Sequence, residues 1–246
     1  MYIILLRFQM GECAVRRGIV LLSVGWGIMW IMFLNLFVQE RKIDIPAFGQ
    51  MPIAGETDAI TFPYKVGDTN LLIEGLGIYD GPFLEDASDS PVTNIAALRI
   101  KNCSKYPVER GAVVLEIDKE RYVFEVYAIP PGESVFVCEL DKKIFTTQPV
   151  LSCTGWAVED IWFDNKEKLS IIETDIDTLQ ITNISNQFLP CIQLLYKSYD
   201  NDSGVYIGGI CYTLDIVSLQ PGESKTVTPY RYVSGYSRIV TVKLSA

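Results

Sequence analysis

The chain of 246 residues contains no histidine, and this absence excludes several kinds of site. Without an imidazole there is no Ser-His-Asp or Cys-His nucleophile, no histidine ligand for zinc and no histidine proton relay. Basic residues are also scarce, with 21 Lys and Arg against 30 Asp and Glu. We therefore expect no nucleic-acid partner, because binding to phosphates needs a basic face.

One long run has no charged residue at all. Residues 18–38 read GIVLLSVGWGIMWIMFLNLFV, in which Ser23 and Asn35 are the polar side chains. A helix of this length spans roughly 30 Å, which is the thickness of the hydrocarbon core of a bilayer. The run predicts a transmembrane signal-anchor helix that attaches the protein to the membrane.

The flanks of this run indicate its orientation. Arg7, Arg16 and Arg17 precede it against a single acidic residue, whereas basic and acidic residues balance just after it. The positive-inside rule then predicts a cytoplasmic N-terminus, residues 1–17, and a cell-membrane protein whose C-terminal domains are extracytoplasmic. A cleaved signal peptide is the competing interpretation, although the small residues that suit cleavage lie well beyond the apolar core.

The segment after the anchor reads as a stalk. Removing residues 1–38 leaves 18 basic and 29 acidic residues, a formal charge of −11 for the part expected outside the membrane. Residues 39–70 contain several prolines and glycines and show no sustained helical period. Ile60 and Phe62 are too apolar for a fully solvated linker, so we expect part of the stalk to dock on the first domain.

Beyond residue 70 the apolar residues recur with a period of two, which is typical of strands. The runs are rich in valine, isoleucine, tyrosine and threonine, and short turn segments separate them. They cover residues 96–100, 112–117, 121–127, 134–139, 192–196, 206–214, 225–227 and 238–244. This pattern predicts an all-β ectodomain.

An internal repeat divides the ectodomain. Residues 97–104 match residues 178–185 at Leu, Ile, Asn and Ser, and the string Pro-Gly-Glu-Ser occurs at both 131–134 and 221–224. The two offsets are 81 and 90, so the second copy is nine residues longer between these landmarks. The extra length falls around residues 200–204, where turn residues predict an extended hairpin.

These landmarks resemble the FxLYD-type, immunoglobulin-like domains of exported, membrane-anchored bacterial proteins. The second copy has Asn183 at a strand end, Tyr199-Asp200 before the hairpin and Pro221-Gly222-Glu223-Ser224 after it, whereas the first copy lacks the Tyr-Asp hairpin. The resemblance covers most of residues 92–246 and implies two tandem antiparallel β-sandwiches, at residues 71–165 and 166–246, after one N-terminal transmembrane helix. It carries no catalytic residue to transfer.

Two acidic segments are candidate sites. Glu159, Asp160 and Asp164 lie beside Trp156 and Trp162, a composition found in glycosidases. Aromatic packing at a junction between the two domains explains the tryptophans equally well, and we prefer it. The hairpin residues 200–204 resemble a calcium loop but lack a following bidentate glutamate. We therefore expect no metal site and no cofactor.

The cysteines leave two interpretations open. Five of them follow the apolar run, an odd number, so at least one is unpaired within the chain. Cys191 and Cys211 lie in strands that flank the long hairpin and are the candidates for a disulfide. The alternative is that they are small buried apolar residues.

The run from Tyr230 to Arg238 has the composition of a binding surface. Tyrosine and arginine are enriched at interfaces because they combine large contact area with hydrogen bonding. The candidate ligand-binding residues are Tyr230, Arg231, Tyr232, Tyr236 and Arg238. The alternative is a sandwich strand whose tyrosines close one edge of a core.

Together these features predict a single-pass, extracytoplasmic membrane protein that is not an enzyme. Its expected role is binding or assembly at the cell surface, with another envelope protein or a glycan as partner. The alternative is a small carbohydrate-active hydrolase of the cell envelope that uses paired carboxylates. We expect no catalytic residue under the preferred interpretation.

The predicted orientation leads to a direct test. Protease added to intact spheroplasts should digest residues 39–246 and leave a small membrane-embedded fragment that immunoblotting of an N-terminal tag detects. Full protection of the C-terminal domains would contradict the orientation inferred from Arg7, Arg16 and Arg17.

Overall fold

The alternating pattern of the sequence forms strands over most of the described chain. The computed structural model describes residues 59–159 and 164–245, and all eight predicted runs lie within or largely within strands. The helical part of these residues is a single 3-10 turn, η1 (Lys166–Lys168). The predicted all-β architecture is therefore confirmed for the described residues.

No helix in the described part of the chain has the length and apolar character needed to cross a bilayer. The predicted membrane segment, residues 18–38, and the first part of the stalk lie outside the described residues.

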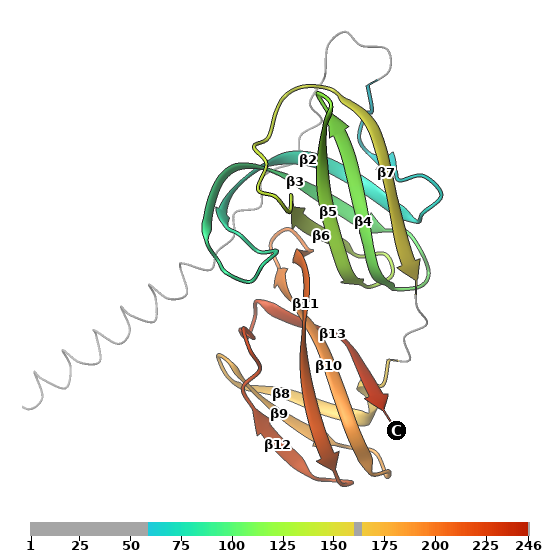
Figure 1. The fold of residues 1–246 in the computed structure, drawn as a ribbon. Coiled ribbons are helices and arrows are strands. Elements are labelled where there is room, and N and C mark those ends of the chain that lie inside the picture. The colour runs from blue at the N-terminus through green and yellow to red at the C-terminus, as the bar shows by residue number, and fades with distance from the viewer. Residues whose placement is uncertain (1–58, 160–163, 246) are drawn as a thin grey trace, which may run out of the picture. The chain divides into compact units, whose positions relative to one another are not determined.

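The first repeat comprises strands β1–β7 (Figure 1). They are β1 (Tyr64–Lys65), β2 (Leu71–Pro82), β3 (Pro91–Asn102), β4 (Val108–Ile117), β5 (Glu120–Ile129), β6 (Ser134–Cys138) and β7 (Val150–Glu159). The neighbours β1-β2-β3-β6 belong to one sheet, and β5-β4-β7 form a second. Side chains from both sheets meet in one apolar core.

The second repeat comprises strands β8–β13. They are β8 (Leu169–Asp175), β9 (Thr178–Asn183), β10 (Leu189–Asp200), β11 (Val205–Leu219), β12 (Ser224–Val227) and β13 (Ser237–Ser245). Strands β12-β9-β8 form one sheet, and β11-β10-β13 lie opposite them across a second core.

The two repeats have the same strand connectivity. Counting from β2 and from β8, the first, second and fifth strands pair in one sheet, and the third, fourth and sixth pair in the other. Ile100 and Ile181 occupy corresponding positions, and both are completely buried in their cores. The predicted equivalence of these two residues is confirmed.

A buried asparagine ends the second strand of each repeat. In the first repeat the Asn102 amide nitrogen donates to Tyr106 O and Ile129 O, at 2.8 and 3.0 Å. Its side-chain oxygen accepts from the Ser104 N–H at 2.9 Å. The backbone oxygen of Asn102 accepts from Gly132 N at 2.9 Å, so this residue joins the Asn-x-Ser turn to the Pro-Gly turn.

Asn183 makes the same set of bonds in the second repeat. Its amide nitrogen donates to Gln187 O and Leu219 O at 2.8 and 3.0 Å, and its side-chain oxygen accepts from Ser185 N at 3.0 Å. Gly222 N donates to Asn183 O at 2.8 Å. In each repeat the Asn-x-Ser segment and the Pro-Gly-Glu-Ser segment are therefore joined by hydrogen bonds into one motif.

The nine extra residues of the second repeat lengthen its central hairpin. Strands β4 and β5 are joined by the two residues Asp118 and Lys119, both with positive φ, as in a tight hairpin turn. The hairpin of β10 and β11 instead has its tip at residues 201–204. The pairing of these strands is irregular next to Tyr196. Between the pairs Tyr196–Tyr212 and Ser198–Ile207, β11 contains several more residues than β10.

The lengthened hairpin completes the first repeat. Tyr206 and Ile207 of β11 pair in parallel with Val135 and Phe136 of β6, which joins strands of both repeats into one seven-stranded sheet (Figure 1). Tyr199 and Tyr206 are buried in the core of the first repeat. The insertion is therefore a structural part of the neighbouring repeat.

The first repeat begins inside the predicted stalk. Ile60 and Phe62 pack against the first core, and Val66 is completely buried. The Ile60 N–H donates to Val150 O of β7 at 2.9 Å. Residues 59–70 thus belong to the folded repeat.

The buried asparagines predict a large effect of one substitution. Asn183→Ala removes bonds to carbonyl groups that are shielded from water, and we expect it to lower the free energy of unfolding by about 3 kcal/mol. Urea unfolding of the full chain, followed by far-UV circular dichroism, measures this change. The exposed Asn201 is the matched control, and Asn201→Ala should cost less than about 1 kcal/mol; equal losses would contradict the structural role of Asn183.

Candidate functional site

The run from Tyr230 to Arg238 differs from the predicted strand. Residues 228–236 form turns, and β13 begins only at Ser237. Tyr232 is 4% exposed, and its hydroxyl donates to Glu173 Oε1 at 2.6 Å. This tyrosine is a core residue, which agrees with the alternative interpretation of the run.

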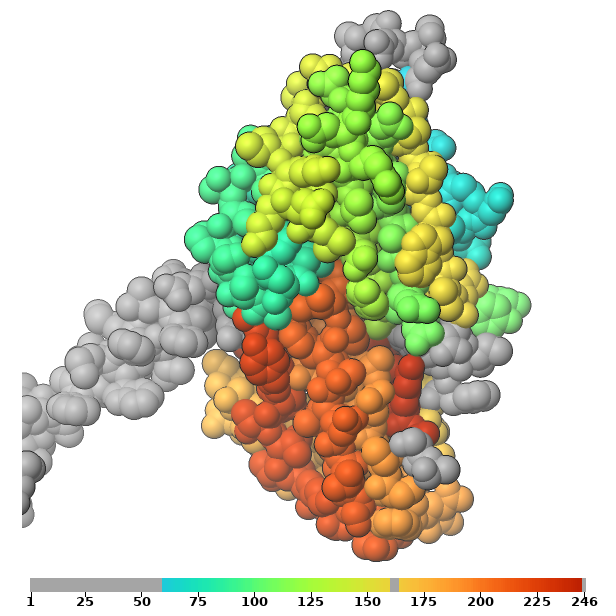
Figure 2. Space-filling view, viewed as in Figure 1, coloured from blue at the N-terminus to red at the C-terminus, as the bar shows by residue number. Residues whose placement is uncertain are grey.

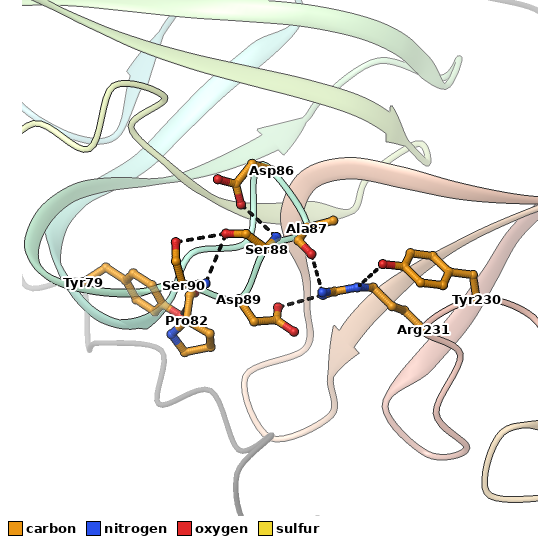
Figure 3. A network of polar contacts seen from close by, with 9 residues as sticks. All are labelled: Tyr79, Pro82, Asp86, Ala87, Ser88, Asp89, Ser90, Tyr230 and Arg231. Atoms are coloured by element: carbon orange, nitrogen blue, oxygen red, sulfur yellow. Dashed lines mark hydrogen bonds and ion pairs between the residues drawn. The ribbon is translucent and has the colours of Figure 1, made fainter.

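Arg231 binds within the chain (Figure 3). Its Nη1 donates to Asp89 Oδ1 at 2.7 Å, its Nη2 donates to Ala87 O, and its Nε donates to the Tyr230 hydroxyl at 3.2 Å. Asp89 and Ala87 lie in the loop between β2 and β3. The guanidinium group therefore ties the second repeat to a loop of the first.

The remaining residues of the run divide into two groups. Arg238 lies over the Tyr199 ring, 3.4 Å from its centroid, and donates to Asn201 Oδ1 at 3.0 Å. Tyr230 and Tyr236 are 67% and 41% exposed. Four of the five predicted binding residues thus have side-chain partners inside the chain, because the Tyr230 hydroxyl accepts from Arg231. Tyr230 and Tyr236 are nevertheless the two that are open to solvent.

The structure does not bring Cys191 and Cys211 together. Cys191 lies opposite Val217, whereas Cys211 precedes Tyr212, which lies opposite Tyr196. The five-residue offset along these strands amounts to about 17 Å, far more than a disulfide spans. All five cysteines of the described residues are free thiols.

The acidic hairpin tip is stabilised by its own backbone. The Asp200 carboxylate accepts hydrogen bonds from the Ser203 N–H at 3.0 Å and from the Ser203 hydroxyl. Within residues 59–159 and 164–245, no group of three or more cysteine, aspartate or glutamate side chains has an arrangement that could hold a metal ion.

The acidic and aromatic cluster near residue 160 is only partly described, because Asp160 and Trp162 lie outside the described residues. Trp156 belongs to β7 and is 49% exposed, so about half of its surface is left open to solvent. Asp164 Oδ1 accepts from the Val242 N–H of β13 at 3.2 Å. Glu159, in contrast, lies at the end of β7 in the first repeat.

A groove runs beside β7 in the first repeat. It has a volume of about 670 Å³ and lies between the turn that follows β1 and the second half of β7. Figure 2 shows the first described residues, in cyan, beside the column of β7, in yellow. Its lining consists of Gly67, Asp68, Thr69, Asn70, Cys153, Thr154, Gly155, Trp156, Ala157 and Glu159.

A glycine fixes the distance between the two walls of the groove. A Cβ atom on Gly155 would lie 2.6 Å from Val66 Cγ1 and 2.6 Å from Ala112 O. These separations are far below van der Waals contact. The absence of a side chain at position 155 therefore lets the turn after β1 pack directly against β7.

The polar wall of the groove is held in place by hydrogen bonds. Glu159 Oε1 accepts from Asn70 Nδ2 at 2.7 Å, and Oε2 accepts from the Ser104 hydroxyl at 2.8 Å. Thr69 Oγ1 donates to Val66 O at 2.6 Å. The exposed carboxylate of Asp68 has no hydrogen-bond or ion-pair partner among the described residues. The groove thus combines a half-exposed indole with oriented carboxylate and amide groups.

The other notable polar cluster is buried where the repeats meet. Lys197 of β10 is completely buried, and its Nζ donates to Tyr127 O at 2.8 Å and to Gly209 O at 3.2 Å. The Glu85 carboxylate accepts from Cys138 N at 2.8 Å and from Gly209 N at 2.5 Å. Glu85 as a whole is partly exposed, but both of its carboxylate oxygens accept hydrogen bonds.

Burial changes the acidity of both groups. It raises the pKa of Glu85 and lowers the pKa of Lys197, because each charged form loses hydration, while their mutual attraction opposes both changes. Their bonds reach the backbone of three strands, and the groove by β7 does not include them. This cluster therefore has a structural role at the junction.

The chain matches no protein-family model and no curated protein sequence. The resemblance to FxLYD-type domains consequently stays a prediction, and the candidate site depends on the geometry of the groove alone.

The buried carboxylate predicts a pH dependence of stability. Because the pKa of Glu85 is raised above its ordinary 4.5, the folded protein holds this proton more tightly than the unfolded chain. The stability that this bound proton gives the folded protein is complete below pH 4.5, and it is lost as the pH rises through the raised pKa of Glu85. Glu85→Gln has no such proton to lose. Between pH 5 and 7 the free energy of unfolding of the variant should therefore rise relative to that of the unmodified chain.

The free energy of unfolding plotted against pH should differ in slope between Glu85→Gln and the unmodified chain. This difference should be at most about 1.4 kcal/mol per pH unit, the value for one proton. Urea unfolding at a series of pH values measures it. Glu109→Gln, at an exposed position, is the control and should leave the slope unchanged. A slope difference of zero or of opposite sign for Glu85→Gln would refute the burial argument.

Proposed function

We propose that the chain is a membrane-anchored, extracytoplasmic protein with a non-catalytic binding or assembly role at the cell surface. Its ligand contacts the groove beside β7 in the first repeat. The observation that carries this proposal is Trp156, which lines the groove and is 49% exposed. A large indole left half in water next to oriented polar groups is typical of a binding site.

The strand pairing supports the immunoglobulin-like part of the proposal. In each repeat the second strand pairs with the fifth, and the third pairs with the sixth. These neighbours correspond to the B–E and C–F pairs of an immunoglobulin sandwich. Domains of this architecture commonly present binding surfaces on edges and loops while the sandwich itself serves as a rigid support.

The sequence supports the membrane-anchored part. Residues 18–38 are uncharged and long enough to span a bilayer, with an arginine-rich N-terminal flank. The compact described residues begin at residue 59, about twenty residues after this run.

The contacts of the carboxylates favour binding over hydrolysis. A glycosidase needs two carboxyl groups on opposite sides of the scissile bond, one of them protonated at working pH. Both oxygens of Glu159 already accept hydrogen bonds from side chains of the first repeat, so this carboxylate is engaged within the chain. Asp164 bonds to β13 of the second repeat and does not line the groove.

Cosedimentation tests the proposal. The full chain, purified in detergent, should sediment with bacterial cell-envelope fragments. Trp156→Ala should weaken retention by about 2 kcal/mol, roughly thirtyfold, because an interfacial tryptophan is a typical hot spot. Phe188→Ala removes an aromatic residue of matching exposure, 48%, outside the groove and should leave retention unchanged.

The same incubation separates binding from hydrolysis. We expect no release of reducing sugar ends into the supernatant. Release that Glu159→Gln abolishes would establish the hydrolase instead. Retention that is insensitive to Trp156→Ala would remove the groove from the proposal.

A further inference from the structure

We propose that the groove beside β7 binds a glycan segment built of neutral or amino-bearing sugars. This inference rests on the proposed function and adds the chemical class of the ligand. It follows from three properties of the lining: its charge, its aromatic surface and the kind of polar groups it presents.

The charge of the lining excludes anionic ligands. Asp68 and Glu159 both line the groove, and its lining contains no lysine or arginine; Arg110 lies over the Trp156 ring from outside this lining, 6.0 Å from the ring centroid. Phosphate, sulfate and uronate groups are recognised by cationic side chains, and an uncompensated carboxylate repels them. The groove therefore favours a ligand without negative charge, and a protonated amine on that ligand gains attraction.

The aromatic surface suits one face of a sugar ring. The apolar part of the lining consists mainly of Trp156, with the small side chains of Cys153 and Ala157. This surface is too small to cover a lipid chain, but an indole face is large enough for one pyranose ring. The π-face carries partial negative charge and attracts the weakly positive C–H groups of that ring.

The polar groups suit hydroxyl groups. Carboxylates accept hydrogen bonds from several directions, and an amide supplies both donors and an acceptor. The bonds to Asn70 and Ser104 fix the Glu159 carboxylate before any ligand arrives, which lowers the entropic cost of binding. The volume of about 670 Å³ lies within the range of small-ligand sites, about 300–1,000 Å³.

A peptide that adds a strand to β7 fits less well. Strand addition needs a free sheet edge along several residues. The start of β7 is already bonded to Ile60, and Val66 packs on Gly155 at its middle. The edge of β7 is therefore occupied over its first half, and the groove offers side chains rather than a continuous backbone edge.

Isothermal titration calorimetry of the full chain tests the inference. The detergent must lack sugar head groups, and the probes are three hexasaccharides: N-acetylglucosamine, glucosamine, and a sulfated hexamer. We expect the glucosamine and N-acetylglucosamine hexamers to bind and the sulfated hexamer to give no measurable heat. Trp156→Ala should weaken binding at least about tenfold, whereas Trp156→Phe should recover part of the affinity.

Two control variants complete the design. Phe188→Ala should leave the affinity unchanged, because that phenylalanine is as exposed as Trp156 but lies outside the groove. Asp68→Asn should weaken binding of the glucosamine hexamer more than binding of its neutral counterpart, because it removes a charge and little volume. An equal effect on both hexamers would overturn the charge argument and with it the assigned class.

The outcomes also separate this inference from the proposed function. If envelope retention depends on Trp156 but neither uncharged nor amino-bearing hexamers bind, the glycan class is wrong and the binding role stands. Preferential binding of the sulfated hexamer would likewise show that the glycan class is wrong while the binding role stands. If neither retention nor hexamer binding responds to Trp156→Ala, both proposals fail.

Discussion

The buried asparagine of each repeat is the interaction on which the sandwiches depend. Asn102 and Asn183 end a central strand, orient the following Asn-x-Ser turn and accept the N–H of a glycine in the Pro-Gly turn. One side chain therefore satisfies backbone groups from segments about 30 residues apart, in an interior where an unpaired carbonyl is costly. Since both sheets of a repeat meet at this point, its geometry sets their relative position.

The difference between the repeats matters as much as their similarity. Nine additional residues change a tight hairpin into a long one, and the added part fills the neighbouring core with Tyr199 and Tyr206. The approach is close, because a side chain at Gly209 would overlap the carbonyl oxygen of Glu125. Lys197 and Glu85 then satisfy the backbone of this irregular stretch. The insertion thus joins one sheet of each sandwich into a continuous seven-stranded sheet.

The sequence predicted the strands well where apolar residues alternate and less well where glycine or small polar residues interrupt them. Strand β2 contains Gly75, Gly77 and Gly81, and β7 contains a Ser-Cys-Thr-Gly stretch, so neither showed a clear period. The groove needs β7 and a turn some 85 residues earlier, and local patterns carry no information on such contacts. Arg231 was predicted to bind a ligand, whereas its observed partners lie within the chain and come from a loop that sequence patterns do not connect to it.

The pairing of β6 with β11 has a consequence for how the protein reaches this fold. Strand β6 precedes its partner β11 by about 70 residues, so the partner is synthesised later. Until then the first repeat has an open sheet edge and an incomplete core, a state that is prone to misassembly. Contacts this distant in sequence slow folding, because the intervening loop must close first. The two repeats should therefore mature together, since neither core is complete before β11 has been made.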